Sequence, residues 1–265
     1  MHGEVIEVER LTPSLVRVVL GGPGLDGCQP TPYTDQYVNA LFVPDGAPYA
    51  APFDLDAARE VAPEHRPKGR RYTIRWWAPA SRTLAIDFVV HGDVGYAGRW
   101  AANARPGDLL QFVGPSGGYA PDPAAPWYLM VGDESALPAI AASLDVLPAG
   151  AIAYVVAVVD DARCELSLDS PADVRVTWLH RHAASGLTPD TLVAAIRALD
   201  LPDGQPDVFV HGEAAEIRAV RTFLVAERGV PREQSSISPY WRRGDTDEAW
   251  RAVKREWVTE MLAEA

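Results

Sequence analysis

The sequence predicts a β-barrel domain followed by an α/β domain: an antiparallel barrel, then a doubly wound parallel sheet with a C-terminal helix. Over residues 1–122, short strand-like stretches are separated by Gly, Pro and Asp turns, which is typical of an antiparallel barrel. Over residues 123–265, continuous apolar strands alternate with amphipathic helices, which indicates a parallel sheet covered on both faces. A chain of 265 residues is long enough to bury two such cores.

The barrel region contains five stretches with a strand pattern. They are VIEVERL (5–11), LVRVVLGG (15–22), DQYVNALFV (35–43), RYTIRWW (71–77) and TLAIDFVVHG (83–92). Residues 45–69 are rich in Pro, Gly and charged side chains, so we expect a long irregular surface loop there. A short helix is expected within GRWAANARPGD (98–108), which Pro106 and Gly107 end.

The α/β region begins after a Pro/Gly-rich linker at residues 114–126. Its expected strands are WYLMV (127–131), AIAYVVAVV (151–159), VRVTWLH (174–180) and DVFVHG (207–212). Helices are expected around 137–144, over 187–199 with Thr188 as N-cap, and over 215–229, where Gly229 ends the helix. A last helix with Thr246 as N-cap follows SPYWRRG, and its expected buried side is Trp250, Val253, Trp257 and Met261.

Composition excludes several classes of partner and site. The net charge of −12 argues against a general affinity for nucleic acid or an anionic membrane. The two cysteines, Cys28 and Cys164, are too few to hold an iron–sulfur cluster by four thiolates. His180 and His182 alternate onto one face but have no third ligand nearby in sequence, so no metal site is expected. Without a signal-peptide pattern or a long apolar run, the expected compartment is the cytoplasm.

RRYTIRWW (70–77) places three arginines in one strand of an acidic chain. Strand alternation separates two faces, one with Arg71, Thr73 and Arg75 and the other with Arg70, Tyr72 and Ile74. By itself this pattern is typical of an ordinary barrel strand, because arginine stems cover apolar surface.

Two further stretches favour nucleotide binding. In HGDVGYAGRWA (91–101), the small residues Gly95, Ala97 and Gly98 stand just before a short helix, where unpaired N–H groups favour a phosphate. Glycines also serve ordinary tight turns, so this signal is weak alone. VGDESALPAI (131–140) is a strand–turn–helix at the carboxyl edge of the sheet, where dinucleotides bind, although it lacks GxGxxG.

Together these stretches resemble a known family. Arg70-x-Tyr72-Thr73 is similar to the RxY[ST] signature of the ferredoxin-reductase-like flavoproteins, and GYAGRWAANARPGD resembles their pyrophosphate loop. More narrowly, the chain resembles the siderophore-interacting proteins, which are bacterial FAD-dependent ferric-siderophore reductases. The stretches that carry this likeness are DFVVHGDVGYAGRWA, PGDLLQFVGPSGGY, WYLMVGDESALPAI and SPYWRRG followed by the C-terminal helix.

The resemblance implies an FAD site and a site for NAD(P)H. Tyr72 would lie against the isoalloxazine ring, Thr73 would hydrogen-bond near flavin N5, and Arg70 would pair with the pyrophosphate. The other residues that it implies around the cofactors are Ile74, His91, Gly95, Ala97, Gly98 and Trp100 for FAD, Gly132, Asp133, Ser135 and Ala136 for the nicotinamide nucleotide, and Trp241 as a cover for the flavin or the cleft.

The implied function is NAD(P)H-dependent, FAD-mediated reduction of a ferric siderophore or similar chelate, with release of Fe(II). The chain departs from the family at Gly98, where serine is usual, and at Asn39 and Ser116, where many relatives carry basic residues that hold the anionic siderophore. Arg242 and Arg243 are the expected replacements. Two alternatives stay open: a flavin oxidoreductase acting on an organic substrate or partner protein, and a carrier that binds a ferric siderophore without redox turnover. NADH and NADPH remain equal alternatives, and no oligomeric state is predicted.

Overall fold

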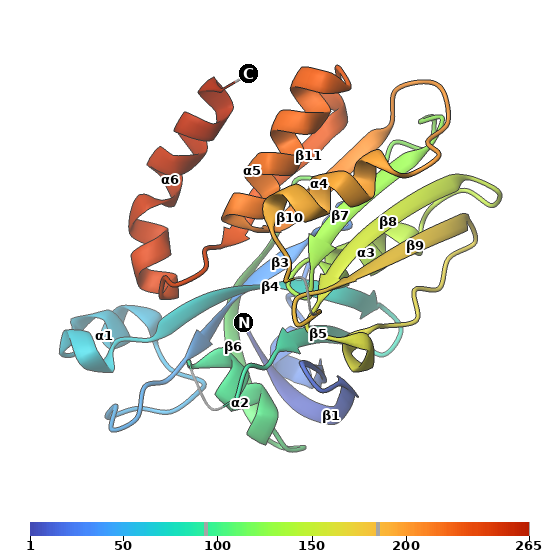
Figure 1. Ribbon diagram of the computed structural model, residues 1–265. Helices are drawn as coiled ribbons and strands as arrows, with labels where there is room; N and C mark the ends of the chain where they lie inside the picture. The colour runs from blue at the N-terminus through green and yellow to red at the C-terminus, as the bar shows by residue number, and fades with distance from the viewer. Residues whose placement is uncertain (93–94, 184–185, 265) are drawn as a thin grey trace. The chain divides into compact units, whose positions relative to one another are not determined.

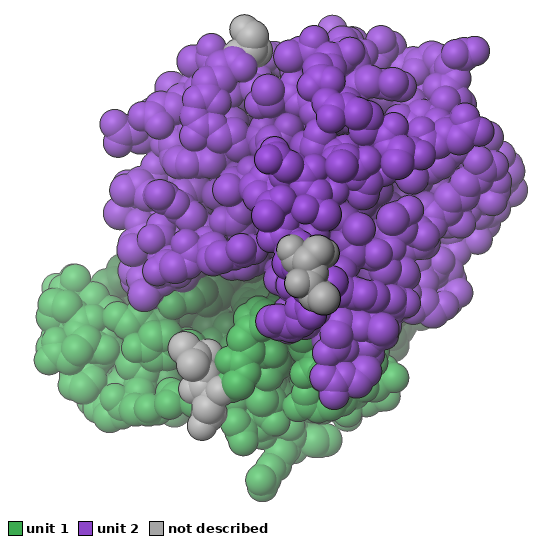
Figure 2. Space-filling model, viewed as in Figure 1, with its two compact units in different colours: residues 1–120 green, residues 121–265 purple. Residues whose placement is uncertain are grey.

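The chain forms two compact units. The computed structural model describes residues 1–92, 95–183 and 186–264. Residues 1–120 make the first unit and residues 121–265 the second, as Figure 2 distinguishes them. Among the described residues, no helix combines the length and the apolar character needed to cross a membrane.

Unit 1 is a closed antiparallel barrel, which confirms the predicted fold. Its strand order is β1-β2-β5-β4-β3-β6 (Figure 1). The strands are β1 (His2–Thr12), β2 (Leu15–Gly21), β3 (Tyr37–Phe42), β4 (Lys68–Ala78), β5 (Thr83–Val89) and β6 (Leu109–Ser116). The sequence pattern did not single out β6, which closes the barrel because it pairs with both β1 and β3.

Two short helices accompany the barrel strands, one packed on the core and one within the long loop. The predicted short helix is α2 (Ala97–Asn103), whose Ala97 and Ala101 are buried in the barrel core. The stretch expected to be irregular contains α1 (Leu55–Glu60), because Asp54 accepts hydrogen bonds from the backbone N–H groups of Asp56 and Ala57. Two 3₁₀ turns complete the unit, Pro23–Leu25 and Pro63–His65.

Strand β4 keeps its alternation only as far as Thr73. Its register with β3 pairs Tyr72 with Val38, which is buried, so the Tyr72 face points into the barrel. Thr73 and Ile74 are both buried, and the register with β5 shifts between Ile74 and Trp76. The extra residue, Arg75, is therefore a β-bulge, and the expected grouping of Arg75 with Thr73 does not follow from simple alternation.

Unit 2 is a parallel sheet, as predicted, in the order β11-β10-β7-β8-β9, and its fifth strand, β11, is one that the sequence pattern did not single out. The strands are β7 (Tyr128–Asp133), β8 (Ile152–Val159), β9 (Asp173–His180), β10 (Asp207–Glu213) and β11 (Ser235–Trp241). The helices are α3 (Leu137–Leu144), α4 (Pro189–Arg197), α5 (Ala214–Thr222) and α6 (Asp247–Ala263), with 3₁₀ turns at Ala162–Cys164 and Arg232–Gln234. Helices α4 and α5 pack on one face, and α3 lies on the other (Figure 1).

The helix limits follow the predicted caps. Thr188 accepts a hydrogen bond from Thr191 N at 3.2 Å, and Thr246 accepts one from Ala249 N at 3.2 Å. Helix α5 continues through a π-helical segment, Phe223–Glu227, before Gly229 turns the chain with φ +65°. The caps at Thr188 and Thr246 fix where α4 and α6 begin.

Candidate functional site

In unit 1, the structure brings Arg70 to the glycine turn before α2. Arg70 Nη1 donates to the carbonyl of Gly69 at 2.9 Å, and its Cζ lies 5.7 Å from the centre of the Tyr96 ring. Tyr96 is the N-cap of α2 and stands between Gly95 and Ala97. Two segments that were singled out separately in the sequence therefore meet, and they place a guanidinium beside the start of a helix.

The glycine turn leaves backbone open to a ligand. Gly95 has φ +82°, and a Cβ added there would meet nothing within 4 Å. At Gly98, a Cβ would lie 3.1 Å from the carbonyl oxygen of Val89, with the backbone nitrogen of His91 at 4.0 Å. The turn thus packs closely on the end of β5, which gives a physical reason for glycine instead of serine at position 98. His91 is exposed beside this turn.

An aromatic group lies next to Arg70 on the same face of β4. The Tyr72 ring centre is 4.4 Å from that of Phe88, and Phe88 is 5.6 Å from Trp100. Tyr72 and Trp100 are half-buried, whereas Thr73 is buried. A guanidinium, an open glycine turn and half-buried rings are the groups that a diphosphate and a flat ring system need, so these residues fit FAD.

The two positions that lack the family's basic residues have a cation beside them. Asn39 is paired with Arg71 in the β3–β4 register, and Tyr37 is paired with Ser116 in the β3–β6 register. Arg71 is exposed, and its Cζ lies 5.5 Å from the centre of the Tyr37 ring. Sequence reasoning gave Arg71 no role, because its position opposite Asn39 follows only from the strand register.

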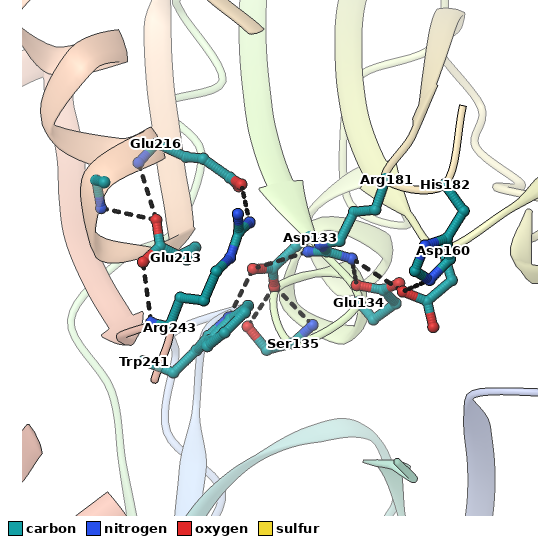
Figure 3. Close-up of polar contacts among 11 residues, drawn as sticks. Asp133, Glu134, Ser135, Asp160, Arg181, His182, Glu213, Glu216, Trp241 and Arg243 are labelled. Atoms are coloured by element: carbon teal, nitrogen blue, oxygen red, sulfur yellow. Dashed lines mark hydrogen bonds and ion pairs between the residues drawn. The ribbon is translucent and has the colours of Figure 1, made fainter. Parts of the chain in front are cut away.

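In unit 2, the turn after β7 gathers the residues predicted for the nicotinamide nucleotide. Asp133 Oδ1 accepts a hydrogen bond from Ser135 N at 2.9 Å, and Asp133 Oδ2 accepts one from the Trp241 indole at 2.7 Å (Figure 3). A Cβ at Gly132 would lie 2.5 Å from Cβ of Ala136, so only glycine allows this tight strand-to-helix turn. Gly132, Asp133, Ser135, Ala136 and Trp241 are therefore assembled at one edge.

Sequence reasoning missed two residues of this edge, Glu134 and Arg181. Arg181 follows β9, and its Nη1 donates to Glu134 Oε2 at 2.6 Å, while its Nη2 lies 3.6 Å from Asp133 Oδ2. Its Cζ is 5.9 Å from the centre of the Trp241 ring. The signal in the sequence was a charged residue directly after a strand, but the strand order is needed to show that Arg181 reaches β7.

This pair carries unusual electrostatics. The side chains of Arg181 and Glu134 are 13% and 3% exposed. Burial raises the pKa of the Glu134 carboxyl, and Arg181 opposes that rise without cancelling it. Burial alone would lower the pKa of Arg181, but the carboxylates of Glu134 and Asp133 hold it above its ordinary value. Glu134 Oε1 and the Nε and Nη2 groups of Arg181 are buried with no hydrogen-bond partner in the described part of the chain.

Arg242 and Arg243, the predicted substrate residues, line a cavity of about 320 Å³ at the start of α5. Its lining also includes Glu213, Glu216, Arg218 and Trp257. Arg243 Nη2 lies 3.0 Å from Glu216 Oε1, and Glu213 accepts hydrogen bonds from the backbone of Arg243 and from the first turn of α5 (Figure 3). Arg242 Nη1 lies 3.7 Å from Asp245 Oδ2.

Glu216 is the most perturbed carboxyl of this group. Burial, reinforced by the charge of Asp133, raises its pKa to about 7 despite the opposing charges of Arg181 and Arg243. His180 and His182, which share one face of the predicted strand, each lie near a carboxylate. His180 Nε2 is 2.8 Å from Glu165 Oε1, and His182 Nε2 is 3.8 Å from Asp160 Oδ1. Within the described residues, no group of three or more His, Cys, Asp or Glu side chains is arranged to hold a metal ion.

Comparison with known proteins accounts for both units. The family model described as "Siderophore-interacting FAD-binding domain" matches residues 4–119, and the model described as "Siderophore-interacting protein" matches residues 125–244. An uncharacterized protein of Mycobacterium tuberculosis is 42% identical over 99% of this chain and 95% of its own length. The ferric vibriobactin reductase ViuB of Vibrio cholerae is 34% identical over 93% of this chain and 91% of its own.

A solved structure agrees with this assignment. The siderophore utilization protein from T. fusca has a TM-score of 0.79 and 36% identity, covering 93% of this chain and 94% of that one. The fold, the residues gathered on β4 and at the turn after β7, and these matches lead to the same conclusion. The chain belongs to the siderophore-interacting protein family.

Proposed function

We propose that this chain is an FAD-dependent oxidoreductase that uses NAD(P)H to reduce ferric siderophores or similar ferric chelates and so releases Fe(II). The observation that carries the proposal is the meeting of Arg70 with the glycine turn before α2, beside the Tyr72 ring. A carrier that only bound a chelate would need neither this arrangement nor the tight turn after β7. When bound, FAD accepts a hydride and releases electrons singly, which is the chemistry that a nicotinamide donor and Fe(III) require.

The barrel residues bind and orient FAD in this proposal. Arg70 and the backbone from Gly95 to Gly98 hold the pyrophosphate, because a guanidinium and open N–H groups both match phosphate oxygens. Tyr72 would lie against the ring system of bound FAD, and the Thr73 hydroxyl would donate a hydrogen bond near N5. The remaining flavin contacts are assigned to Ile74, His91, Ala97 and Trp100, which border the same segments.

The turn after β7 receives the nicotinamide nucleotide. It lies at the carboxyl edge of a parallel sheet, where ligands of such sheets bind. Gly132 allows the close turn into α3, in which Ala136 packs against Gly132, and Ser135 would border the nucleotide. The hydrogen bond from Trp241 to Asp133 fixes the indole, which covers the ligand and excludes water. These residues position the donor and move no proton.

The ferric chelate depends on local cations, because the chain as a whole carries a net charge of −12. Arg242 and Arg243 border the cavity beside α5, and Arg71 is exposed opposite Asn39. Reduction promotes release, because Fe(II) suits the hard oxygen donors of siderophores less well than Fe(III) does. The metal step needs binding and charge, and no acid–base residue is required for it.

A different electron acceptor is the second candidate function. Asn39 and Ser116 supply no charge where relatives are often basic, which favours an organic substrate or a partner protein as the acceptor of electrons from FAD.

One experiment separates these functions. The purified protein is examined for the yellow absorption of oxidised flavin, mixed anaerobically with NADH or NADPH, and then with several ferric chelates and a chromogenic trap for Fe(II). Bleaching of the flavin followed by Fe(II) formation supports ferric-chelate reduction. Bleaching without Fe(II) from any chelate transfers the assignment to the second candidate. A protein that binds ferric chelates but takes up no FAD is a carrier, and the proposal is then wrong.

A further inference from the structure

Asp160 lies at the carboxyl edge of the sheet, directly after the strand next to β7. The sheet order makes β8 the neighbour of β7, and β8 ends at Val159, immediately before Asp160. In doubly wound sheets that bind dinucleotides across the carboxyl edge, an acidic residue downstream of the first strand–turn–helix hydrogen-bonds the ribose hydroxyls of NAD. A 2′-phosphate needs an arginine in that region instead.

The Asp160 carboxylate is available to accept hydrogen bonds. Its side chain is 31% exposed, and its Oδ1 lies 3.7 Å from Arg181 Nη1 and 3.8 Å from the imidazole Nε2 of His182 (Figure 3). Both distances exceed a hydrogen bond. Glu134 Oε1 has no hydrogen-bond partner among the described residues, but it is buried, in a side chain only 3% exposed. The accessible acceptor is therefore Asp160, and a carboxylate suits hydroxyl groups and not a phosphate.

Arg163 and Arg181, which follow β8 and β9, are each paired with a carboxylate, and the Nε and Nη2 groups of Arg181 that lack a hydrogen-bond partner among the described residues are buried. Arg163 Nη2 lies 2.7 Å from Asp161 Oδ2, and Arg181 Nη1 lies 2.6 Å from Glu134 Oε2. A 2′-phosphate would have to displace one of these carboxylates or remain beside Asp160. In the segments that directly follow β7, β8 and β9, Asp133, Glu134, Asp160 and Asp161 outnumber Arg163 and Arg181, so this part of the edge disfavours an additional anion.

We propose that this edge selects NADH over NADPH, with Asp160 accepting hydrogen bonds from the adenosine ribose and repelling a 2′-phosphate. The inference rests on the proposed function, since it requires that a nicotinamide dinucleotide bind at the turn after β7. It assigns a specificity role to a residue that touches the donor and none of the reacting atoms.

Binding is measured without turnover. Flavin-loaded protein is titrated calorimetrically with ADP-ribose and with 2′-phospho-ADP-ribose, which lack the nicotinamide. ADP-ribose should bind at least about tenfold more tightly, since hydrogen bonds to a charged group and charge repulsion both favour it. Asp160→Asn should remove most of that ratio. Asp173→Asn is the matched control, because it removes a carboxylate at the start of β9, on the opposite edge of the same sheet, and should leave the ratio unchanged.

Flavin reduction provides the second readout. The parent should show a kcat/KM for NADH at least about tenfold above that for NADPH, and Asp160→Arg should reverse the order, because the new guanidinium would pair with the 2′-phosphate. If the parent uses NADPH as well as NADH, or binds 2′-phospho-ADP-ribose as tightly as ADP-ribose, the selectivity is wrong while the reductase assignment stands. If neither nucleotide reduces the bound flavin, the proposed function itself fails, and this inference with it.

Discussion

The arginines beside the candidate sites of the two units have different neighbours. In the barrel, Arg70 and Arg71 lie over the rings of Tyr96 and Tyr37. In the sheet unit, Arg181 and Arg243 lie against the buried carboxylates of Glu134 and Glu216. A ring attracts a guanidinium without accepting an ion pair from it, whereas a buried carboxyl group occupies one of its N–H groups. Arg71, which is exposed over its ring, is therefore suited to recognise an outside anion, whereas Arg181 and Arg243 are suited to hold the turns of the carboxyl edge in place.

The largest effect is expected from breaking the Arg181–Glu134 pair. Arg181→Leu leaves the Glu134 carboxyl buried without its cation, so the free energy of unfolding should fall by about 3–5 kcal/mol. Chemical denaturation of the flavin-free protein measures this change. The double variant Arg181→Leu with Glu134→Leu should recover much of the loss, because no uncompensated charge then remains buried.

The control for this pair is Arg251→Leu on α6. Arg251 Nε lies 2.8 Å from Asp247 Oδ2, with side chains 42% and 33% exposed, so the loss should be below about 1 kcal/mol. Equal losses for Arg181→Leu and Arg251→Leu would mean that the sheet arginines are not structural, and the contrast between the two units would disappear.

Glu216 should give the sheet unit a distinct pH dependence. Its pKa is raised from 4.5 to about 7, so between these values the folded state keeps a proton that the unfolded state has lost. Stability from this group is complete below pH 4.5 and is lost as the pH rises through about 7, a fall of about 3 kcal/mol. Glu216→Gln should remove that fall, as measured by unfolding free energies across this range.

Glu227→Gln is the matched substitution for Glu216. Glu227 pairs with Arg197, and its side chain is 55% exposed instead of buried. The variant should therefore keep the parent's slope. Between pH 4.5 and 7, the unfolding free energy of the parent should fall more steeply than that of Glu216→Gln. Equal slopes would contradict the raised pKa of Glu216.

The sequence was sufficient wherever a signal is local. Arg70-x-Tyr72-Thr73, the small residues from Gly95 to Gly98 and the cap at Thr246 are each read within a few positions, and the barrel and parallel sheet follow from alternation and apolar runs. Trp250 and Met261 form the buried side of α6 as expected. Val253, expected beside them, is 39% exposed.

Contacts between residues on different strands could not be predicted from such local signals. The Arg181–Glu134 pair requires a side chain after β9 to reach the turn after β7, and nothing in the separate segments specifies that distance. The same holds for Arg71 opposite Asn39, which depends on a register that the bulge at Arg75 could have shifted. Strand β6 was also not predicted, because its segment, within PGDLLQFVGPSGGY, stands out only as a family motif.

A moderate effect is expected from Arg70 on cofactor affinity. Arg70→Ala removes charge-assisted hydrogen bonds to the pyrophosphate, worth about 1.5–3 kcal/mol, so the FAD dissociation constant should rise roughly 10- to 100-fold. Fluorescence titration of the flavin-free protein measures this. Arg105→Ala is the control, because Arg105 is an exposed arginine of the same unit. Unchanged FAD affinity in Arg70→Ala would remove the arginine from the flavin site.

The smallest effect concerns the ferric chelate and tests which arginines receive it. Arg71 is exposed over Tyr37, whereas Arg243 is held by Glu216 and Arg242 lies near Asp245. Arg71→Gln should raise the KM for an anionic ferric chelate about two- to fivefold, since exposed charge interactions contribute only about 0.2–1 kcal/mol. Its salt dependence should weaken as well, because salt screens such attraction.

The paired experiment substitutes both Arg242 and Arg243 by Gln and follows the same KM in steady-state Fe(II) formation. A larger increase in KM there than in Arg71→Gln would mean that the chelate displaces Glu216 and Asp245 from Arg243 and Arg242. Arginines paired with carboxyl groups would then recognise the anion. A larger increase in Arg71→Gln keeps the contrast between the units, because the cation over a ring then binds the chelate. If neither variant changes the KM, the chelate is held by other groups, and both sets of arginines are excluded from its recognition.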